Sequence, residues 1–357
     1  MRISRLCGSA DVDCPAHLPI RKRGLPRSPA YSQARPAPLA YRLPVASPSE
    51  LDPFAGLPDA DRLRRLPLLA GAREAVPLSG GITNRNYKVT LAAGPLVVRV
   101  YEHESSALAI NRENEHLNSV AAAESGAGAS VIEYLPVENM LIVGWIEGRT
   151  FSEADVRIPE NLPRIADACR VLHAGPRFVN DFNMFAIQAR YLALVRDRGF
   201  RLPPRYEEFM PKVERLSKVM AATAEPTVPC NNDLLAGNFI DEGPRIRLID
   251  YEYSGNNEAS FELGNIWSES TLPDELLEVL VHSYWKGLSS QELAAKVARA
   301  RLWGLMSKYG WTLWASISAS ISPIDFDYWG WGMEKYDRAV IEFDGGEFDR
   351  FVNVLTN

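Results

Sequence analysis

A chain of 357 residues is long enough for two lobes with separate cores, because single hydrophobic cores stop growing near about 250–300 residues. Hydrophobic residues make up 46% and charged residues 24%, as in an ordinary globular protein. The net charge of −6 hides a basic start: residues 1–50 carry eight basic and three acidic side chains, which leaves −11 for the rest. An acidic body argues against nucleic acid as a partner and is compatible with a cationic substrate.

The four cysteines, Cys7, Cys14, Cys169 and Cys230, show neither disulfide nor zinc-site spacing. No apolar run reaches the roughly 18 residues of a membrane helix, and the amino terminus lacks a signal-peptide core. These features predict a cytoplasmic protein without membrane insertion. They give no indication of its oligomeric state.

Residues 1–55 are rich in proline and arginine, with eight prolines in the first 50 positions and no periodic apolar pattern. Such a segment cannot bury enough apolar surface to offset the entropy lost on ordering. We therefore expect a disordered tail.

The next part of the chain, 56–146, reads as a small antiparallel β lobe. A short helix is expected over 59–69, and β-rich runs at 87–91 and 96–101 are joined by a turn at 92–95. A helix is expected over 107–123, followed by strands over 130–134 and 140–146. A hinge is expected near Glu147 and Gly148.

The remainder, 147–357, is predicted to be a larger and mostly helical lobe. Apolar residues recur at helical spacing over 160–173, 184–198, 205–222, 274–286 and 291–320. Ser289 and Glu292 form a capping-box signature for the last of these helices. The fold class is therefore α+β, with a small antiparallel β lobe and a larger α-helical lobe.

The stretch from Cys230 to Tyr253 carries the strongest chemical signal. Asp233 is followed five positions later by Asn238, and an apolar strand then ends in Asp250. Protein kinases place a catalytic Asp, a metal-binding Asn and a second metal-binding Asp in this order, which predicts phosphoryl transfer and a two-lobed, protein-kinase-like fold. The alternative is a surface hairpin in which Asp and Asn serve as turn residues.

Two further segments fit a nucleotide site. The run Ser79–Asn84 contains paired glycines, whose backbone N–H groups can approach phosphate oxygens closely, although Gly-Gly also marks ordinary hairpins. Arg99 interrupts an apolar strand and could hold phosphates with Glu115 of the next helix as its ion-pair partner. The alternative is an edge-strand arginine that faces solvent.

Several phrases together, SGGITNRNYKV, VVRVY, INRENE, CNNDLLAGN, LIDYEYSGNN and FELGNIWSE, resemble the choline/ethanolamine kinase family. That family belongs to the aminoglycoside-phosphotransferase-like branch of the kinase fold. The resemblance runs from about residue 77 to about residue 337 and implies ATP and Mg²⁺ as cofactors. Asn231 departs from it where the family usually has His, and Glu262 replaces Asp. A neutral amide at 231 is expected to slow turnover, so that Asn231→His would raise kcat.

Residue by residue, the resemblance implies three groups of site residues. The catalytic base would be Asp233, and the Mg²⁺ ligands would be Asn238 and Asp250. The nucleotide would be bound by Ser79, Gly80, Gly81, Thr83, Asn84, Arg99, Glu115, Trp145 and Glu147. The acceptor would be bound by Glu252, Tyr253, Glu269, Trp311, Trp314 and Trp331.

Five of the eight tryptophans lie between Trp303 and Trp331. Trp311 and Trp314 are three apart on one predicted helix and face the same way. Such aromatic stripes are usually core. With the kinase motifs present, we favour an aromatic box for a quaternary ammonium, which ring quadrupoles attract.

The sequence thus predicts an ATP- and Mg²⁺-dependent kinase that phosphorylates the hydroxyl of choline or ethanolamine. Two alternatives remain open. The first is an antibiotic kinase, which would need several carboxylates to bind a polycationic sugar. The second is a kinase-fold protein without turnover, and Asn231 is the only residue that supports it.

Overall fold

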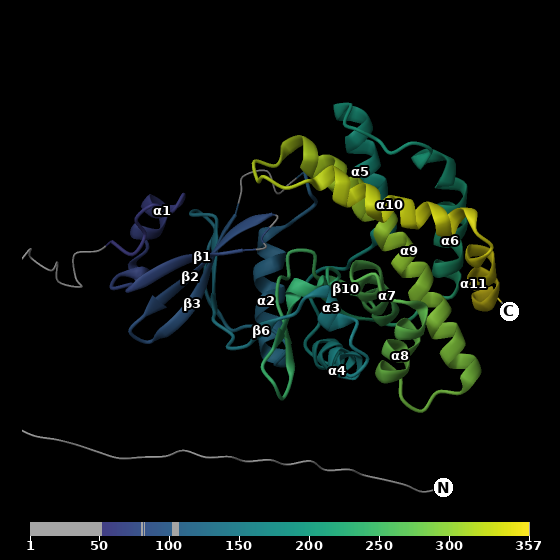
Figure 1. The fold of residues 1–357 in the computed structure, drawn as a ribbon, viewed down its shortest axis with the longest axis horizontal. Helices are drawn as coiled ribbons and strands as arrows, with labels where there is room; N and C mark the ends of the chain where they lie inside the picture. Colours follow the sequence, from purple (N-terminus) through teal and green to yellow (C-terminus); the bar gives the residue numbers. More distant parts are fainter. Residues whose placement is uncertain (1–51, 80, 82, 102–106, 357) are drawn as a thin grey trace, which may run out of the picture. The chain divides into compact units, whose positions relative to one another are not determined.

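A computed structural model describes residues 52–79, 81, 83–101 and 107–356, and its fold is drawn in Figure 1. Most of the predicted tail lies outside these residues. Its last four positions do not behave as a tail, because Phe54 is 4% exposed and packs with Leu63, Leu69 and Tyr87. The predicted tail boundary at residue 55 is therefore too late. The lobe boundary at 146 and 147 stays a prediction.

The small lobe is built on one five-stranded sheet in the order β1-β2-β3-β5-β4. All four strand pairs are antiparallel. The strands are β1 (Glu74–Leu78), β2 (Asn84–Leu91), β3 (Gly94–Tyr101), β4 (Val131–Leu135) and β5 (Met140–Gly144). The antiparallel sheet confirms the predicted architecture of this lobe.

Side chains alternate between the two faces of β3, as the period of a strand requires. Leu96, Val98 and Val100 are buried against the small-lobe core, which includes residues of α1 (Ala60–Arg64). Val97 and Arg99 therefore point to the opposite face. β3 lies between β2 and β5, so the idea of an edge-strand arginine is wrong.

Helix α2 (Arg112–Ser125) begins five residues later than the sequence predicted. The side chain of Asn111 accepts hydrogen bonds from the backbone N–H groups of Glu113 and Asn114 and so caps the helix. Gly126 ends it with a left-handed φ of 85°. The helix carries Glu115 to a position beside β3.

The larger lobe is mostly helical, as predicted. Its helices are α3 (Glu153–Val156), α4 (Asn161–His173), α5 (Met184–Arg198), α6 (Met210–Ala222), α7 (Ala259–Glu269), α8 (Asp274–Tyr284), α9 (Ser290–Ile321), α10 (Tyr328–Asp344) and α11 (Glu347–Thr356). The long helix α9 packs against α5, α7, α10 and α11 (Figure 1). None of the helices in the described part of the chain has the length and apolar character needed to cross a membrane.

Short paired strands flank the loops that carry Asp233, Asn238 and Asp250. β8 (Phe239–Asp241) pairs with β9 (Ile246–Leu248) and with β6 (Arg149–Thr150), and β7 (Thr227–Cys230) pairs with β10 (Gly255–Glu258). The segment that contains Asp233 and Asn238 runs from β7 to β8, and Asp250 follows β9. The hairpin β8–β9 thus returns Asp250 toward Asp233.

Helix α7 was not predicted from the sequence, and its burial explains why. Every residue from Ala259 to Glu269 is buried, so the polar residues Glu262, Asn265 and Glu269 bond to partners inside the protein and no solvent-exposed face marks the segment as a helix. A Cβ on Gly264 would collide with the carbonyl oxygen of Ala300 on α9. Glycine is thus required where these two helices approach each other.

The burial of Phe54 gives a test of where the folded body begins. We expect Phe54→Ala to lower the free energy of unfolding by about 3–5 kcal/mol, the usual effect of removing a buried phenyl ring. A variant that starts at Leu51 should keep the parent's midpoint. Urea denaturation measures both, and an unchanged midpoint for Phe54→Ala would show that the ring is not part of the core.

Candidate active site

A cavity of about 640 Å³ brings together most of the predicted site residues. Strands β2, β3 and β5 supply part of its wall, and the segments 233–253 and 311–331 supply the rest. The predicted residues that line it are Ser79, Gly81, Thr83, Arg99, Trp145, Asp233, Asn238, Asp250, Glu252, Tyr253, Trp311, Trp314 and Trp331. Residues more than 230 positions apart therefore share one chamber.

Arg99 joins the sheet to the segment after β9. Its Nη1 donates to Glu115 Oε1 at 2.8 Å and to Asp250 Oδ1 at 2.6 Å. The guanidinium is 12% exposed and the Glu115 carboxylate is fully buried. These two carboxylates raise the pKa of Arg99, against the lowering effect of burial. Arg99 therefore carries a permanent positive charge at the cavity wall.

The loop around Asp233 is fixed by Glu262 of α7. The carboxylate accepts the backbone N–H of Asn231 at 2.8 Å through Oε1 and that of Asn232 at 2.7 Å through Oε2. Asn232 has a left-handed φ of 67°, a conformation that asparagine tolerates better than most residues. The extra methylene of Glu262 relative to the family's Asp is accommodated, and both of its oxygens bind the loop.

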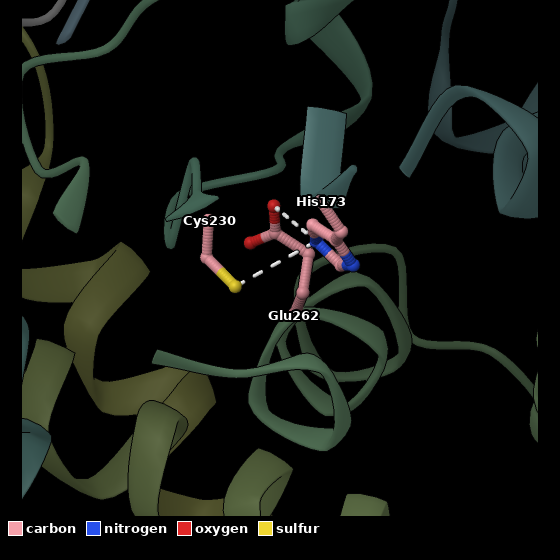
Figure 2. Close-up of side chains that lie close together, drawn as sticks. All are labelled: His173, Cys230 and Glu262. Carbon is pink, nitrogen blue, oxygen red and sulfur yellow. Dashed lines mark hydrogen bonds and ion pairs between the residues drawn. The ribbon is translucent and has the colours of Figure 1, made fainter. Parts of the chain in front are cut away.

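Figure 2 shows a buried cluster behind this loop, formed by His173, Cys230 and Glu262. His173 Nε2 lies 3.6 Å from Cys230 Sγ and 3.7 Å from Glu262 Oε1. Its Nδ1 is 2.7 Å from the Tyr284 hydroxyl. Burial, followed by the Glu262 charge, raises the pKa of the Cys230 thiol. Because Glu262 already accepts two backbone N–H groups, we interpret the cluster as the anchor of the loop.

Asn231, which stands where the family has His, is completely buried, and its side chain makes three hydrogen bonds. Its Nδ2 donates to the carbonyl oxygens of Ile249 at 3.1 Å and Asp250 at 2.8 Å, and its Oδ1 accepts from Asp233 N at 3.1 Å. The amide thus ties the Asp233 loop to the strand end at Asp250. This bonding favours the opposite of the expectation that Asn231 slows turnover, and kinetics of a variant can decide between the two.

We accordingly expect Asn231→His to lower kcat. A neutral imidazole offers one donor and one acceptor, so at least one of the three bonds is lost, which costs about 1–3 kcal/mol in a buried site. The rate should fall about tenfold to a hundredfold, with little change in KM for ATP. Steady-state kinetics measure both constants, and a kcat at or above the parent's would restore the first expectation.

Asp233 lies on the cavity wall. Burial is the largest cause that raises the pKa of its carboxyl, followed by the negative charges of Glu269, Asp250 and Glu252, while Lys335 opposes the shift. Asn238 Nδ2 donates to the Asp233 carbonyl oxygen at 2.8 Å. This bond fixes the spacing between the two side chains and leaves Asn238 Oδ1 as a possible cation ligand.

The donor set beside Asp233 fits a hard divalent cation. Asn238 and Asp250 offer an amide oxygen and a carboxylate from the same cavity wall, and Mg²⁺ prefers oxygen ligands. Asp250 adopts a left-handed φ of 65°, which is uncommon outside glycine, and backbone strain of this kind concentrates at functional sites. Its Oδ1 accepts from Arg99.

Glu252, predicted to lie near the metal and acceptor, lines the cavity but is bonded to the small lobe. Its Oε1 accepts from Thr83 Oγ1 at 2.8 Å, and its Oε2 accepts from Asn84 Nδ2 at 2.9 Å and from Arg112 Nη1 at 3.1 Å. Burial, and next the charge of Asp250, raise the pKa of this carboxyl. Glu252 therefore joins residues 83–84 and α2 to the segment after β9.

Only some of the residues predicted to bind the nucleotide line the cavity. Ser79, Gly81, Thr83 and Trp145 line the cavity, with apolar neighbours such as Leu141 and Val143 that the sequence did not single out. Asn84 and Glu115 do not line the cavity. Asn84 donates a hydrogen bond to Glu252 and Glu115 accepts one from Arg99, and these two partners line the cavity. Gly80 lies outside the described residues. The Glu147 side chain is exposed and does not line the cavity, so any contribution must come from its backbone.

Aromatic rings form the other end of the cavity. Trp314 Nε1 donates to the Tyr253 hydroxyl at 2.7 Å, and the Tyr253 and Trp311 rings meet edge to face with centroids 4.8 Å apart. Trp331 packs against Trp314 at 5.5 Å. Trp311 and Trp314 are each 3% exposed, so they belong to the core and to the cavity wall together. Phe326 also lines this end, and no pattern in the sequence indicated it.

Glu269, the remaining residue of the predicted acceptor group, does not line the cavity. Its Oε2 accepts a hydrogen bond from Lys335 Nζ on α10. The two side chains are 1% and 3% exposed. The carboxylate expected to face the acceptor is thus paired with a cation of the protein itself.

Fold and site together define a small-molecule phosphotransferase of the kinase-like class. The family model for choline/ethanolamine kinase matches residues 76–277. The chain therefore belongs to the choline/ethanolamine kinase family and is an ATP-dependent alcohol phosphotransferase.

Individual relatives are named as ethanolamine kinases or as members of the same family. The chain is 28% identical to a probable ethanolamine kinase A of Dictyostelium discoideum over 73% of its own length and 83% of the relative's. It is 29% identical to ethanolamine kinase 2 of Mus musculus over 68% of each chain. A choline/ethanolamine kinase family protein from Mesorhizobium loti superposes with a TM-score of 0.72 and 27% identity over 83% of this chain and 98% of that one.

Proposed function

We propose that this kinase transfers the γ-phosphoryl group of ATP to the hydroxyl of choline, with ethanolamine as a poorer acceptor. The observation that carries the proposal is that Asp233, Asn238, Asp250 and Arg99 line one cavity whose other end is aromatic. The likeness to named ethanolamine kinases supports the amino-alcohol class. A choline kinase from Streptococcus pneumoniae shares the fold with a TM-score of 0.65 and 23% identity.

In this mechanism Asp233 orients the acceptor hydroxyl and accepts its proton as the oxygen attacks the γ-phosphorus, while the bond from that phosphorus to the bridging oxygen breaks and ADP leaves. Asn238 and Asp250 would hold Mg²⁺, which would supply charge neutralisation for the phosphates. Arg99 exchanges part of its contact with Asp250 for phosphate oxygens. Positioning and charge neutralisation account for most of the rate, because phosphoryl transfer needs little covalent chemistry from the protein.

The choice of choline rests on which groups remain free at the aromatic end. Glu252 is bonded to Thr83, Asn84 and Arg112, and Glu269 is paired with Lys335. A trimethylammonium group needs no hydrogen-bond acceptor and is attracted by the indole and phenol rings. A primary ammonium would leave donors unpaired, at about 1–3 kcal/mol for each buried group. An antibiotic kinase is not favoured, because a polycation would find few free carboxylates.

An acceptor panel tests this function. ADP release with ATP and Mg²⁺ should be fastest with choline, slower with ethanolamine and close to background with aminoglycosides. We expect choline to lead ethanolamine by about tenfold or more in kcat/KM. Equal kcat/KM for both amines would contradict selection by an aromatic box. ADP release with an aminoglycoside but with neither amine would show that the protein is an antibiotic kinase.

A further inference from the structure

The ammonium of Lys335 lies over the ring of Trp331, a tryptophan that was predicted to bind the acceptor's ammonium. Lys335 Nζ lies 4.1 Å from the centroid of the Trp331 ring, and Trp331 lines the aromatic end of the cavity. The same ammonium pairs with the Glu269 carboxylate, and both side chains are almost fully buried. Lys335 therefore already contacts one face of Trp331 and the carboxylate of Glu269, both of which were predicted to bind the acceptor.

We propose that Lys335 determines acceptor specificity by filling the place where a primary ammonium would otherwise bind. A carboxylate beside an indole face suits a primary ammonium, because the carboxylate accepts N–H bonds and the ring attracts the charge. With Lys335 there, Glu269 is neutralised and a small amine loses its strongest partner. A quaternary ammonium needs neither group and keeps the other rings. This inference rests on the proposed function and names the residue behind its selectivity.

Glu269 retains capacity for such a ligand. Its Oε1 is buried and has no hydrogen-bond partner among the described residues, while Oε2 takes the bond from Lys335. A buried carboxylate without a paired cation is strongly unfavourable. Removal of Lys335 would therefore leave a carboxylate that gains most from a new cation with N–H donors, and truncation would open an ammonium-sized space beside Trp331.

The chain offers a matched control in Lys308 on α9. Its side chain is 2% exposed, pairs with Glu342 and lies 4.0 Å from the centroid of the Trp267 ring. The ring beneath Lys308, Trp267, does not line the cavity, whereas the ring beneath Lys335, Trp331, does. Lys308→Ala thus removes the same kind of buried lysine, carboxylate and indole contact without changing the acceptor site.

The experiment compares kcat/KM for ethanolamine and choline in the parent, Lys335→Ala and Lys308→Ala. We expect Lys335→Ala to raise the ratio of ethanolamine to choline by about tenfold, mainly through a lower KM for ethanolamine, with KM for ATP unchanged. The double variant Lys335→Ala with Glu269→Gln should lose this gain. Lys308→Ala should lower the melting temperature and leave the ratio at the parent's value.

A purely structural Lys335 would give a different result: kcat would fall by the same factor for both amines and the ratio would not move, which would overturn the proposal. A ratio that rises equally in Lys308→Ala would overturn it as well. Lys335→Met keeps the apolar stem of the side chain, removes the ammonium and replaces the alanine variant if that variant does not fold. If the parent phosphorylates neither amine, the proposed function fails separately, and calorimetric binding of methylammonium against tetramethylammonium decides the role of Lys335 by the same comparison.

Discussion

Asp233→Asn is expected to lower kcat by about 10²–10⁴-fold, the usual contribution of a positioned general base. Asparagine keeps the shape of the side chain but cannot accept the proton of the acceptor hydroxyl. The backbone bonds of residue 233 to Asn231 and Asn238 do not involve the carboxylate, so the loop should persist. Nucleotide affinity, measured by calorimetry with a non-hydrolysable ATP analogue, should stay within about twofold, well under the tenfold that corresponds to 1.4 kcal/mol.

Asp241→Asn is the matched control for this change. Asp241 lies on β8 in the same stretch of chain, pairs with Arg164 and does not line the cavity. Its substitution should leave kcat close to the parent's. Full turnover by Asp233→Asn, or an equal loss in both variants, would contradict the assignment of Asp233.

Asp250→Asn is expected to abolish the Mg²⁺ dependence of nucleotide binding and to lower kcat by at least about 10²-fold, because a lost carboxylate ligand removes several kcal/mol of charge stabilisation. The variant also takes away one of the two carboxylates that hold Arg99. Calorimetric titration of the ATP analogue with and without Mg²⁺ measures the effect. The parent should bind more tightly with the metal, and the variant equally well in both conditions.

The two variants must differ from each other. Asp233→Asn should still bind the nucleotide more tightly with Mg²⁺ than without it, whereas Asp250→Asn should gain no affinity from Mg²⁺. If Asp250→Asn retains metal-dependent binding, Asp250 is not a metal ligand and its left-handed backbone has another origin.

Local patterns in the sequence were sufficient for the two-lobed architecture and for the order of the catalytic motifs. Arg99 was singled out because it interrupts an apolar strand, and the spacing of Asp233, Asn238 and Asp250 indicated one site. Helix α7 was not predicted, because the helix is fully buried and its polar residues Glu262, Asn265 and Glu269 bond to partners in other parts of the chain. The start of α2 depends on a single capping residue, Asn111.

Partners far apart in the chain were the main information missing from the sequence. Nothing local to Glu269 indicates that Lys335, 66 positions later, neutralises it. The Asn231 side chain bonds to the carbonyl oxygens of Ile249 and Asp250, which no pattern near residue 231 indicates. Glu252, predicted to bind the acceptor, is bonded to Thr83 and Arg112, and no pattern near residue 252 indicates these distant partners.

The most direct test of the central claim is ³¹P NMR of the parent enzyme with ATP, Mg²⁺ and choline. Transfer to the acceptor hydroxyl predicts a new phosphomonoester resonance that grows in step with ADP, requires both choline and Mg²⁺, and is absent with Asp233→Asn. Growth of inorganic phosphate in place of the phosphomonoester, or a phosphomonoester formed equally well by Asp233→Asn, would contradict the account.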